Sequence, residues 1–104
     1  MNEPRLLVLM VPRERRDDFV DTLMEWEELS GFTLLPALGY SREHSHLSVP
    51  EQVVGYRDFD RFEVVLDALH LPPLFERLSE ACGRERLRYW VYPLSAEGHL
   101  PGPS

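Results

Sequence analysis

The chain predicts an α+β fold whose elements follow the order strand, helix, strand, strand, helix, strand. Two observations indicate this order: four segments of strand length are apolar throughout or alternate with polar residues, and two other segments repeat apolar residues at helical spacing. All six elements fall within residues 1–95, and 104 residues leave room for one domain only. Residues 96–104, which hold Gly and Pro, are expected to form a flexible C-terminal tail.

The first half of the chain begins with an apolar run over residues 5–11, which Pro12 ends. The run is too short to span a membrane, so it predicts a buried strand. From about Arg13 the spacing becomes that of an amphipathic helix, which we expect to end at Ser30-Gly31, with Trp26 packing at its edge. Its apolar stripe consists of Phe19, Val20, Leu23 and Met24.

A second strand is expected over residues 32–40. Pro36 interrupts it and cannot donate a ladder hydrogen bond, which implies an edge position or a bulge. Residues 41–58 hold Pro50 and Gly55 and show no sustained period, so we interpret them as a long loop. Loops of this length in compact domains are usually functional or disordered, and we therefore expect function to reside here.

The second half repeats the strand-helix-strand plan. Residues 59–66 alternate, with Phe62, Val64 and Leu66 on one side. The segment His70-Leu71-Pro72-Pro73 opens a second helix, because the first helical turn tolerates proline, and Gly83 is suited to ending it. Residues 87–94 predict the last strand. The buried stripe of the second helix consists of Leu74, Phe75, Leu78, Ala81 and Cys82.

This element order is the split βαβ, or ferredoxin-like, arrangement: a four-stranded antiparallel sheet with two helices on one face. The second face is also expected to be apolar, since residues 5–11 are apolar at nearly every position and Leu35, Val65 and Trp90 or Tyr92 alternate away from the helices. Burial of each such side chain gains about 1.5–3 kcal/mol, so the whole face approaches the net stability of a domain. We therefore predict a homo-oligomer that covers this face.

Composition excludes several partners. The formal net charge of −7 repels phosphate backbones, so nucleic acid is not expected to bind. Cys82 is the single cysteine and cannot form an intramolecular disulfide, and the sequence shows no signal peptide and no apolar run long enough to insert into a membrane. These features predict a cytoplasmic protein.

Several motifs together resemble the nitrogen regulatory PII-like superfamily over residues 6–94. They are Gly31-Phe32-Thr33, Gly39-Tyr40-Ser41, Phe62-Glu63-Val64-Val65-Leu66 and Tyr89-Trp90-Val91-Tyr92-Pro93-Leu94. A second set within the long loop resembles, more narrowly, an uncharacterised PII-like family found with Cus-type heavy-metal efflux pumps. That set is Ser41-Arg42-Glu43-His44, Leu47-Ser48, Glu51-Gln52-Val53 and Gly55.

The resemblance implies a homotrimer with a sheet-lined centre, a T-loop at residues 41–58, and effector binding in the clefts between subunits near the base of that loop. It also implies a membrane transporter as partner of the T-loop, of the heavy-metal RND efflux type. The effector-binding and T-loop residues implied are Tyr40, Ser41, Arg42, Glu43, Glu51, Gln52 and Arg57.

ATP or ADP binding of the PII kind is not expected. A typical PII protein carries a phosphate-binding loop rich in glycine and lysine before its last strand, and here that place holds the short Cys82-Gly83-Arg84-Glu85-Arg86. Glycine backbone N–H groups cradle polyphosphates, and Gly83 alone supplies few of them. Arg84 and Arg86 can still attract an anion.

His44 and His46 form a His-x-His pair, whose imidazoles share one side of an extended segment and suit Zn²⁺ or Cu²⁺. Glu43, Glu51 or a histidine of another subunit would have to complete the site. The alternative is that both histidines are simply exposed loop residues.

Other candidates have structural interpretations. Arg42, Arg57 and Arg61 flank the loop and are expected either to bind a phosphate or to pair with acidic residues. Cys82 is expected to act as a small buried hydrophobe, and His70 as a residue of a turn or helix cap. No nucleophile-base pair is recognisable, so an enzyme is not predicted. The leading hypothesis is a regulator of a transporter, and the alternative is a CutA-like trimer that binds divalent metal without a transporter.

Overall fold

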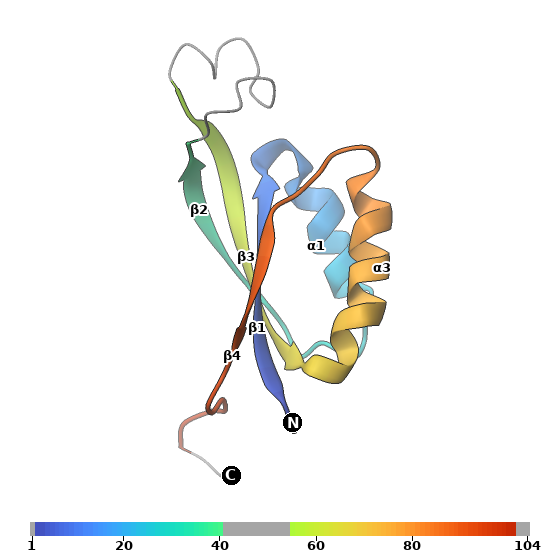
Figure 1. Ribbon diagram of the computed structural model, residues 1–104, viewed down its shortest axis with the longest axis vertical. Coiled ribbons are helices and arrows are strands. Elements are labelled where there is room, and N and C mark those ends of the chain that lie inside the picture. The colour runs from blue at the N-terminus through green and yellow to red at the C-terminus, as the bar shows by residue number, and fades with distance from the viewer. Residues whose placement is uncertain (1, 41–54, 102–104) are drawn as a thin grey trace.

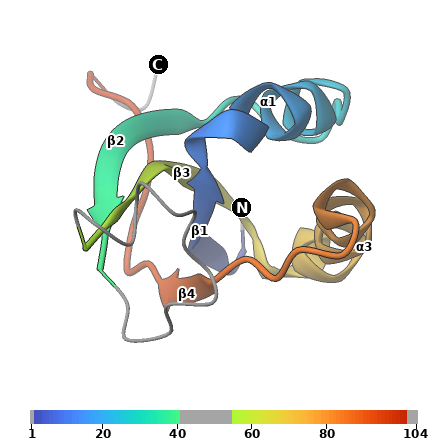
Figure 2. The same ribbon diagram turned by 90° about the horizontal axis from the view of Figure 1, so that it is seen from above.

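The structure is a computed structural model that describes residues 2–40 and 55–101. It confirms the predicted α+β class: four antiparallel strands form one sheet in the order β2-β3-β1-β4, and both helices cover the same face of that sheet (Figures 1 and 2). The elements are β1 (Pro4–Pro12), η1 (Arg13–Arg15), α1 (Arg16–Met24), β2 (Thr33–Gly39), β3 (Arg57–Asp67), η3 (Ala68–His70), α3 (Leu71–Cys82) and β4 (Tyr89–Pro93).

The core lies between the sheet and the two helices. The alternation predicted for β3 is confirmed: its buried residues face the helices, and the register places Val64 opposite Leu7 and Phe62 opposite Leu9 of β1. The helices bury the stripe residues Phe19, Leu23, Leu74 and Leu78 against this face. Burial of each such side chain stabilises the fold by about 1.5–3 kcal/mol.

Strand β2 lies at an edge of the sheet, which is where Pro36 was expected to place it. Near its end, Gly39 allows an aromatic ring to lie directly over the backbone. A Cβ atom at Gly39 would come within 2.2 Å of the Phe59 ring, so a larger residue would push that ring away. The outer part of the β2–β3 hairpin is therefore packed through Phe59 on the face away from the helices.

The first helix is shorter than predicted. It ends at Met24, and the backbone N–H groups of Trp26 and Leu29 donate to the carbonyls of Leu23 and Trp26 in turns that replace the expected helix to Ser30-Gly31. Trp26, two residues beyond this end, lies in the core, where it is only 8% exposed and packs edge-on against His70, with 5.8 Å between ring centroids. Met24, which was assigned to the stripe, is instead 69% exposed.

The long loop is also shorter than its expected range of 41–58. Strand β3 begins at Arg57, because antiparallel pairing with β2 continues to the pairs Leu38–Asp58 and Gly39–Arg57. Helix α3 agrees with the prediction: prolines occupy its first turn, and Gly83 ends it with a positive φ of 62°. This conformation favours glycine.

The second face of the sheet carries no helix in the described structure, and we call it the open face. As predicted, Leu6, Val65 and Tyr92 lie side by side on it in the strand register. On the same face, Trp90 of the edge strand β4 lies 5.6 Å from the guanidinium carbons of both Arg61 and Arg88, measured to the ring centroid. The open face therefore combines apolar side chains with a cluster of one tryptophan and two arginines.

The N-terminal end of β1 is held by Asp67, whose carboxylate accepts hydrogen bonds from the backbone N–H groups of Asn2, Glu3 and Leu69 at 2.9, 3.2 and 3.0 Å. These donors lower the pKa of Asp67 below its ordinary value of 3.8. A lowered folded-state pKa contributes stability above the unfolded-state value and loses it as pH falls through the folded value.

Asp67→Asn is therefore expected to lower the free energy of unfolding at pH 7 and to flatten its decline between pH 4 and pH 2. Urea unfolding at several pH values measures both effects. Asp21→Asn, an exposed position on α1, is the control. If the free energy of unfolding falls equally with pH in the wild type and in Asp67→Asn, the Asp67 carboxylate does not stabilise the fold in this way.

Candidate functional site

The described structure contains two of the implied site residues. Tyr40 directly follows β2, and Arg57 is the first residue of β3, so the two flank the loop. Tyr40 is 72% exposed, and its ring packs against Tyr56 with 5.8 Å between centroids. Outside the described residues lie Ser41, Arg42, Glu43, His44, His46, Glu51 and Gln52. The geometry that follows is therefore that of the base of the loop.

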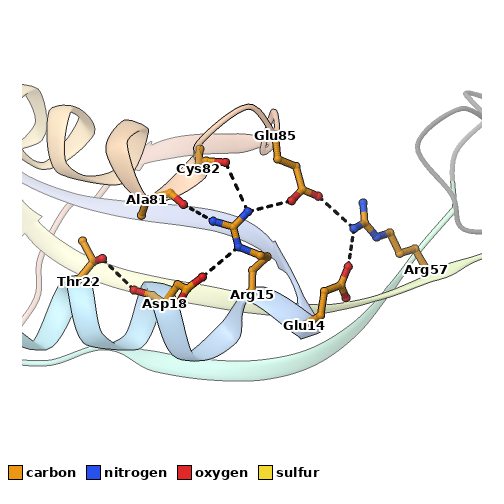
Figure 3. Close-up of polar contacts among 8 residues, drawn as sticks. All are labelled: Glu14, Arg15, Asp18, Thr22, Arg57, Ala81, Cys82 and Glu85. Atoms are coloured by element: carbon orange, nitrogen blue, oxygen red, sulfur yellow. Dashed lines mark hydrogen bonds and ion pairs between the residues drawn. The ribbon is translucent and has the colours of Figure 1, made fainter.

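Arg57 pairs with acidic residues, which was one of its two expected roles. Its Nη2 atom donates to Oε1 of Glu14 at 2.7 Å and to Oε1 of Glu85 at 3.0 Å (Figure 3). Burial opposes the charge of Arg57, but the two carboxylates outweigh burial and raise its pKa. Burial likewise would raise the pKa of Glu14, yet the hydrogen bond from Arg57 helps to hold it below its ordinary value.

Arg15 is the second cation of this site, and no pattern in the sequence indicated its role. Its Nε donates to Asp18 at 3.2 Å, its Nη1 to Glu85 at 3.2 Å and to the Cys82 carbonyl at 3.4 Å, and its Nη2 to the Ala81 carbonyl. The last carbonyls of a helix have no partner within the helix and attract cations. Arg15 therefore fastens the start of α1 to the end of α3 (Figure 3).

Cys82 lies at that end of α3 and packs against the core, in agreement with its expected role as a small hydrophobe. Burial raises the pKa of its thiol, and the nearby charge of Arg15 only partly opposes this shift. The thiol is therefore held in its protonated form at neutral pH, which is unlike the thiolate that a nucleophilic cysteine requires.

An open hollow of about 1470 Å³ adjoins the ion pairs. It exceeds the roughly 300–1,000 Å³ of closed small-molecule pockets, so it is a broad depression that a ligand or another chain can enter. The base of the loop, the connection from α3 to β4 and the start of β4 all contribute to it. Its lining includes Tyr40, Arg57, Phe75, Glu85, Arg86, Arg88, Tyr89 and Trp90. The lining therefore mixes aromatic and charged side chains.

The remaining candidates lie elsewhere. Arg61 on β3 donates to Glu63 at 3.1 Å, so it also pairs with an acidic residue. His70 ends η3, as expected of a turn residue, with its Nε2 atom 3.5 Å from Glu28 Oε2. Within residues 2–40 and 55–101, no three His, Cys, Asp or Glu side chains are grouped as a metal site would require. In the same residues, no helix is long and apolar enough to cross a membrane.

The fold and the site together define a class: a ferredoxin-like α+β domain in which the hairpin loop and the α3–β4 connection share one hollow. The chain belongs to the family described as "Protein of unknown function (DUF3240)", whose model matches residues 1–101. A search of curated proteins finds no match to the chain.

Two solved structures are similar to the chain. The crystal structure of a DUF3240 family protein from Shewanella baltica OS155 is 38% identical, with a TM-score of 0.80 over 96% of this chain and 99% of that one. A Bacillus cereus protein related to NIF3 is 18% identical, with a TM-score of 0.67 over 92% of this chain but only 27% of that one. The second likeness shows the fold alone.

Proposed function

We propose that this protein is a PII-like regulatory protein that assembles as a homotrimer, senses a small effector or a metal ion, and modulates a membrane transporter of the heavy-metal efflux type. The observation that carries the proposal is the position of Arg57: it lies at the base of the loop, lines the hollow and pairs with Glu85 of the α3–β4 connection. A ligand in the hollow therefore lies within reach of the residues that hold the base of the loop.

The open face supports the proposed trimer. Its apolar side chains include Leu35 and Tyr92, which are 42% and 48% exposed in the single chain, and association would remove this surface from water. Of the two arginines beside Trp90, Arg61 already pairs with Glu63 in the same chain, so association would bury its charge together with a partner. The single cysteine fits a protein that acts in the cytoplasm.

A CutA-like trimer that binds divalent metal without a transporter is the alternative. The two functions differ in what the loop does: in the first it engages a protein, and in the second the trimer itself holds the metal. His44 and His46 belong to this loop, so Zn²⁺ or Cu²⁺ remains the candidate ion in both. ATP or ADP is not part of the proposal, since Gly83 is the one glycine in the α3–β4 connection.

Deletion of residues 41–55 separates the two functions. With the full chain as bait, a heavy-metal RND pump is expected to co-purify from solubilised membranes, and the deletion is expected to abolish this binding. Titration calorimetry with Zn²⁺, Cu²⁺ and Ag⁺ on the same two proteins measures metal binding. Saturable metal binding by the full chain without any transporter partner would support the alternative. If the full chain binds neither a transporter nor a metal ion, both functions are overturned.

A further inference from the structure

Glu85 contacts two arginines that come from different parts of the fold. Its Oε1 atom accepts from Arg57 at 3.0 Å, and its Oε2 atom accepts from Arg15 at 3.2 Å (Figure 3). Arg57 begins the inner strand of the hairpin, whereas Arg15 lies in η1, just before α1. The carboxylate of Glu85 therefore bridges the base of the loop and the helix layer.

Each end of this bridge is anchored. Arg15 also binds Asp18 on α1 and the carbonyls of Ala81 and Cys82 at the end of α3, so its guanidinium position depends on both helices. The three side chains are largely sheltered, with exposed fractions of 16% for Arg57, 26% for Arg15 and 30% for Glu85. Ion pairs in a sheltered network are screened less by water and salt than exposed pairs.

Glu14 provides the contrast within the same cluster. It also binds Arg57, at 2.7 Å, but its side chain is 61% exposed and no contact to Arg15 accompanies it among the described ion pairs. Exposed pairs of this kind contribute little. The two carboxylates therefore differ in what they join: Glu14 joins the hairpin base to η1, whereas Glu85 joins the hairpin base and Arg15 to the connection that follows α3.

We propose that Glu85 is a coupling residue that links the outer end of the β2–β3 hairpin to the end of α3, so that a change at either end is transmitted to the other. An anionic group that enters the hollow can exchange with Glu85 at a guanidinium, because carboxylates and phosphates bind arginine in the same manner. Release of Glu85 then loosens both the hairpin base and the α3–β4 connection. The coupling rests on these contacts and does not require the proposed function.

Amide hydrogen exchange of the full chain tests the coupling. Arg15→Gln is the decisive variant, because Arg15 is joined to Arg57 through Glu85. It is expected to raise exchange about fivefold or more at residues 56–60, in line with the coupling energies of charge networks. Glu85→Gln is expected to raise exchange both there and at residues 80–88. Arg13→Gln, an exposed neighbour, and Glu14→Gln are the matched controls, with no change at 80–88 expected for either.

Two outcomes would overturn the proposal. In the first, Arg15→Gln raises exchange only at α1 and the end of α3 and leaves residues 56–60 unchanged. In the second, Glu14→Gln and Glu85→Gln give the same pattern. Residues 6–9 of the central strand report global unfolding, so a variant that unfolds as a whole is recognised by faster exchange there. In that case the conservative variants Arg15→Lys and Glu85→Asp, which keep the charges and change the reach, must show the same distant effect.

Discussion

Phe62→Ala is expected to lower the free energy of unfolding by about 3–5 kcal/mol, the usual cost of removing a large aromatic side chain from a core. Phe62 is fully buried on the central strand β3. Its ring packs edge-on against Phe19 and stacks on Phe32, with 6.5 and 5.9 Å between centroids. Domains of this size are stable by about 5–15 kcal/mol, so this one change removes a large part of the total.

Urea unfolding followed by circular dichroism measures this loss. Phe75→Ala is the matched control, since Phe75 is only partly buried on α3 and packs against the exposed Tyr89. We expect it to cost clearly less than Phe62→Ala. Equal losses for the two variants would contradict the placement of the core between β3 and the two helices.

Val65→Glu is expected to convert the proposed trimer into a folded monomer. Val65 lies on the open face opposite Leu6, so a carboxylate there would be buried without a partner in any assembly that covers this face. The fold itself should survive, because Val65 is only partly buried in the single chain and points away from the core. Light scattering after size exclusion distinguishes a particle near 12.2 kDa from one of three times that mass.

Met24→Glu is the control for this experiment, because it places the same charge on an exposed apolar residue of the helix layer. It is expected to leave the particle mass unchanged. A monomeric wild type at micromolar concentration would refute the open face as a subunit interface, and a trimeric Val65→Glu would place the interface elsewhere.

Much of the fold could be predicted because its signals are local. The apolar run that forms β1, the alternation in β3 and the proline in β2 each report on the environment of their own strand. The end of α1 could not be predicted in this way. Helical spacing continues past Met24, because Trp26 stands at the spacing that continues the buried stripe of Phe19 and Leu23, so the local pattern does not mark the end of the helix.

The candidate site was predictable only in part. The resemblance implied Tyr40 and Arg57 as effector-binding or T-loop residues, and this role stays a prediction; the structure places Tyr40 just after β2 and Arg57 at the start of β3. The partners of Arg57 escaped prediction, because Glu14 and Glu85 are separated from it by 43 and 28 residues and look like ordinary surface charges. Arg15 was missed for the same reason, since the carbonyls it binds lie 66 and 67 residues away. Contacts over such separations leave no periodic signal in a sequence.

The two tryptophans of the chain lie on opposite sides of the sheet. Trp26 packs in the core beside the helices, and Trp90 lies on the open face near two guanidinium groups. Indole fluorescence depends on solvent and nearby charge, so each tryptophan, in a variant that lacks the other, is an optical reporter of its own side of the sheet. Emission from Trp26 follows unfolding of the helix layer, whereas emission from Trp90 follows whatever approaches the other side of the sheet.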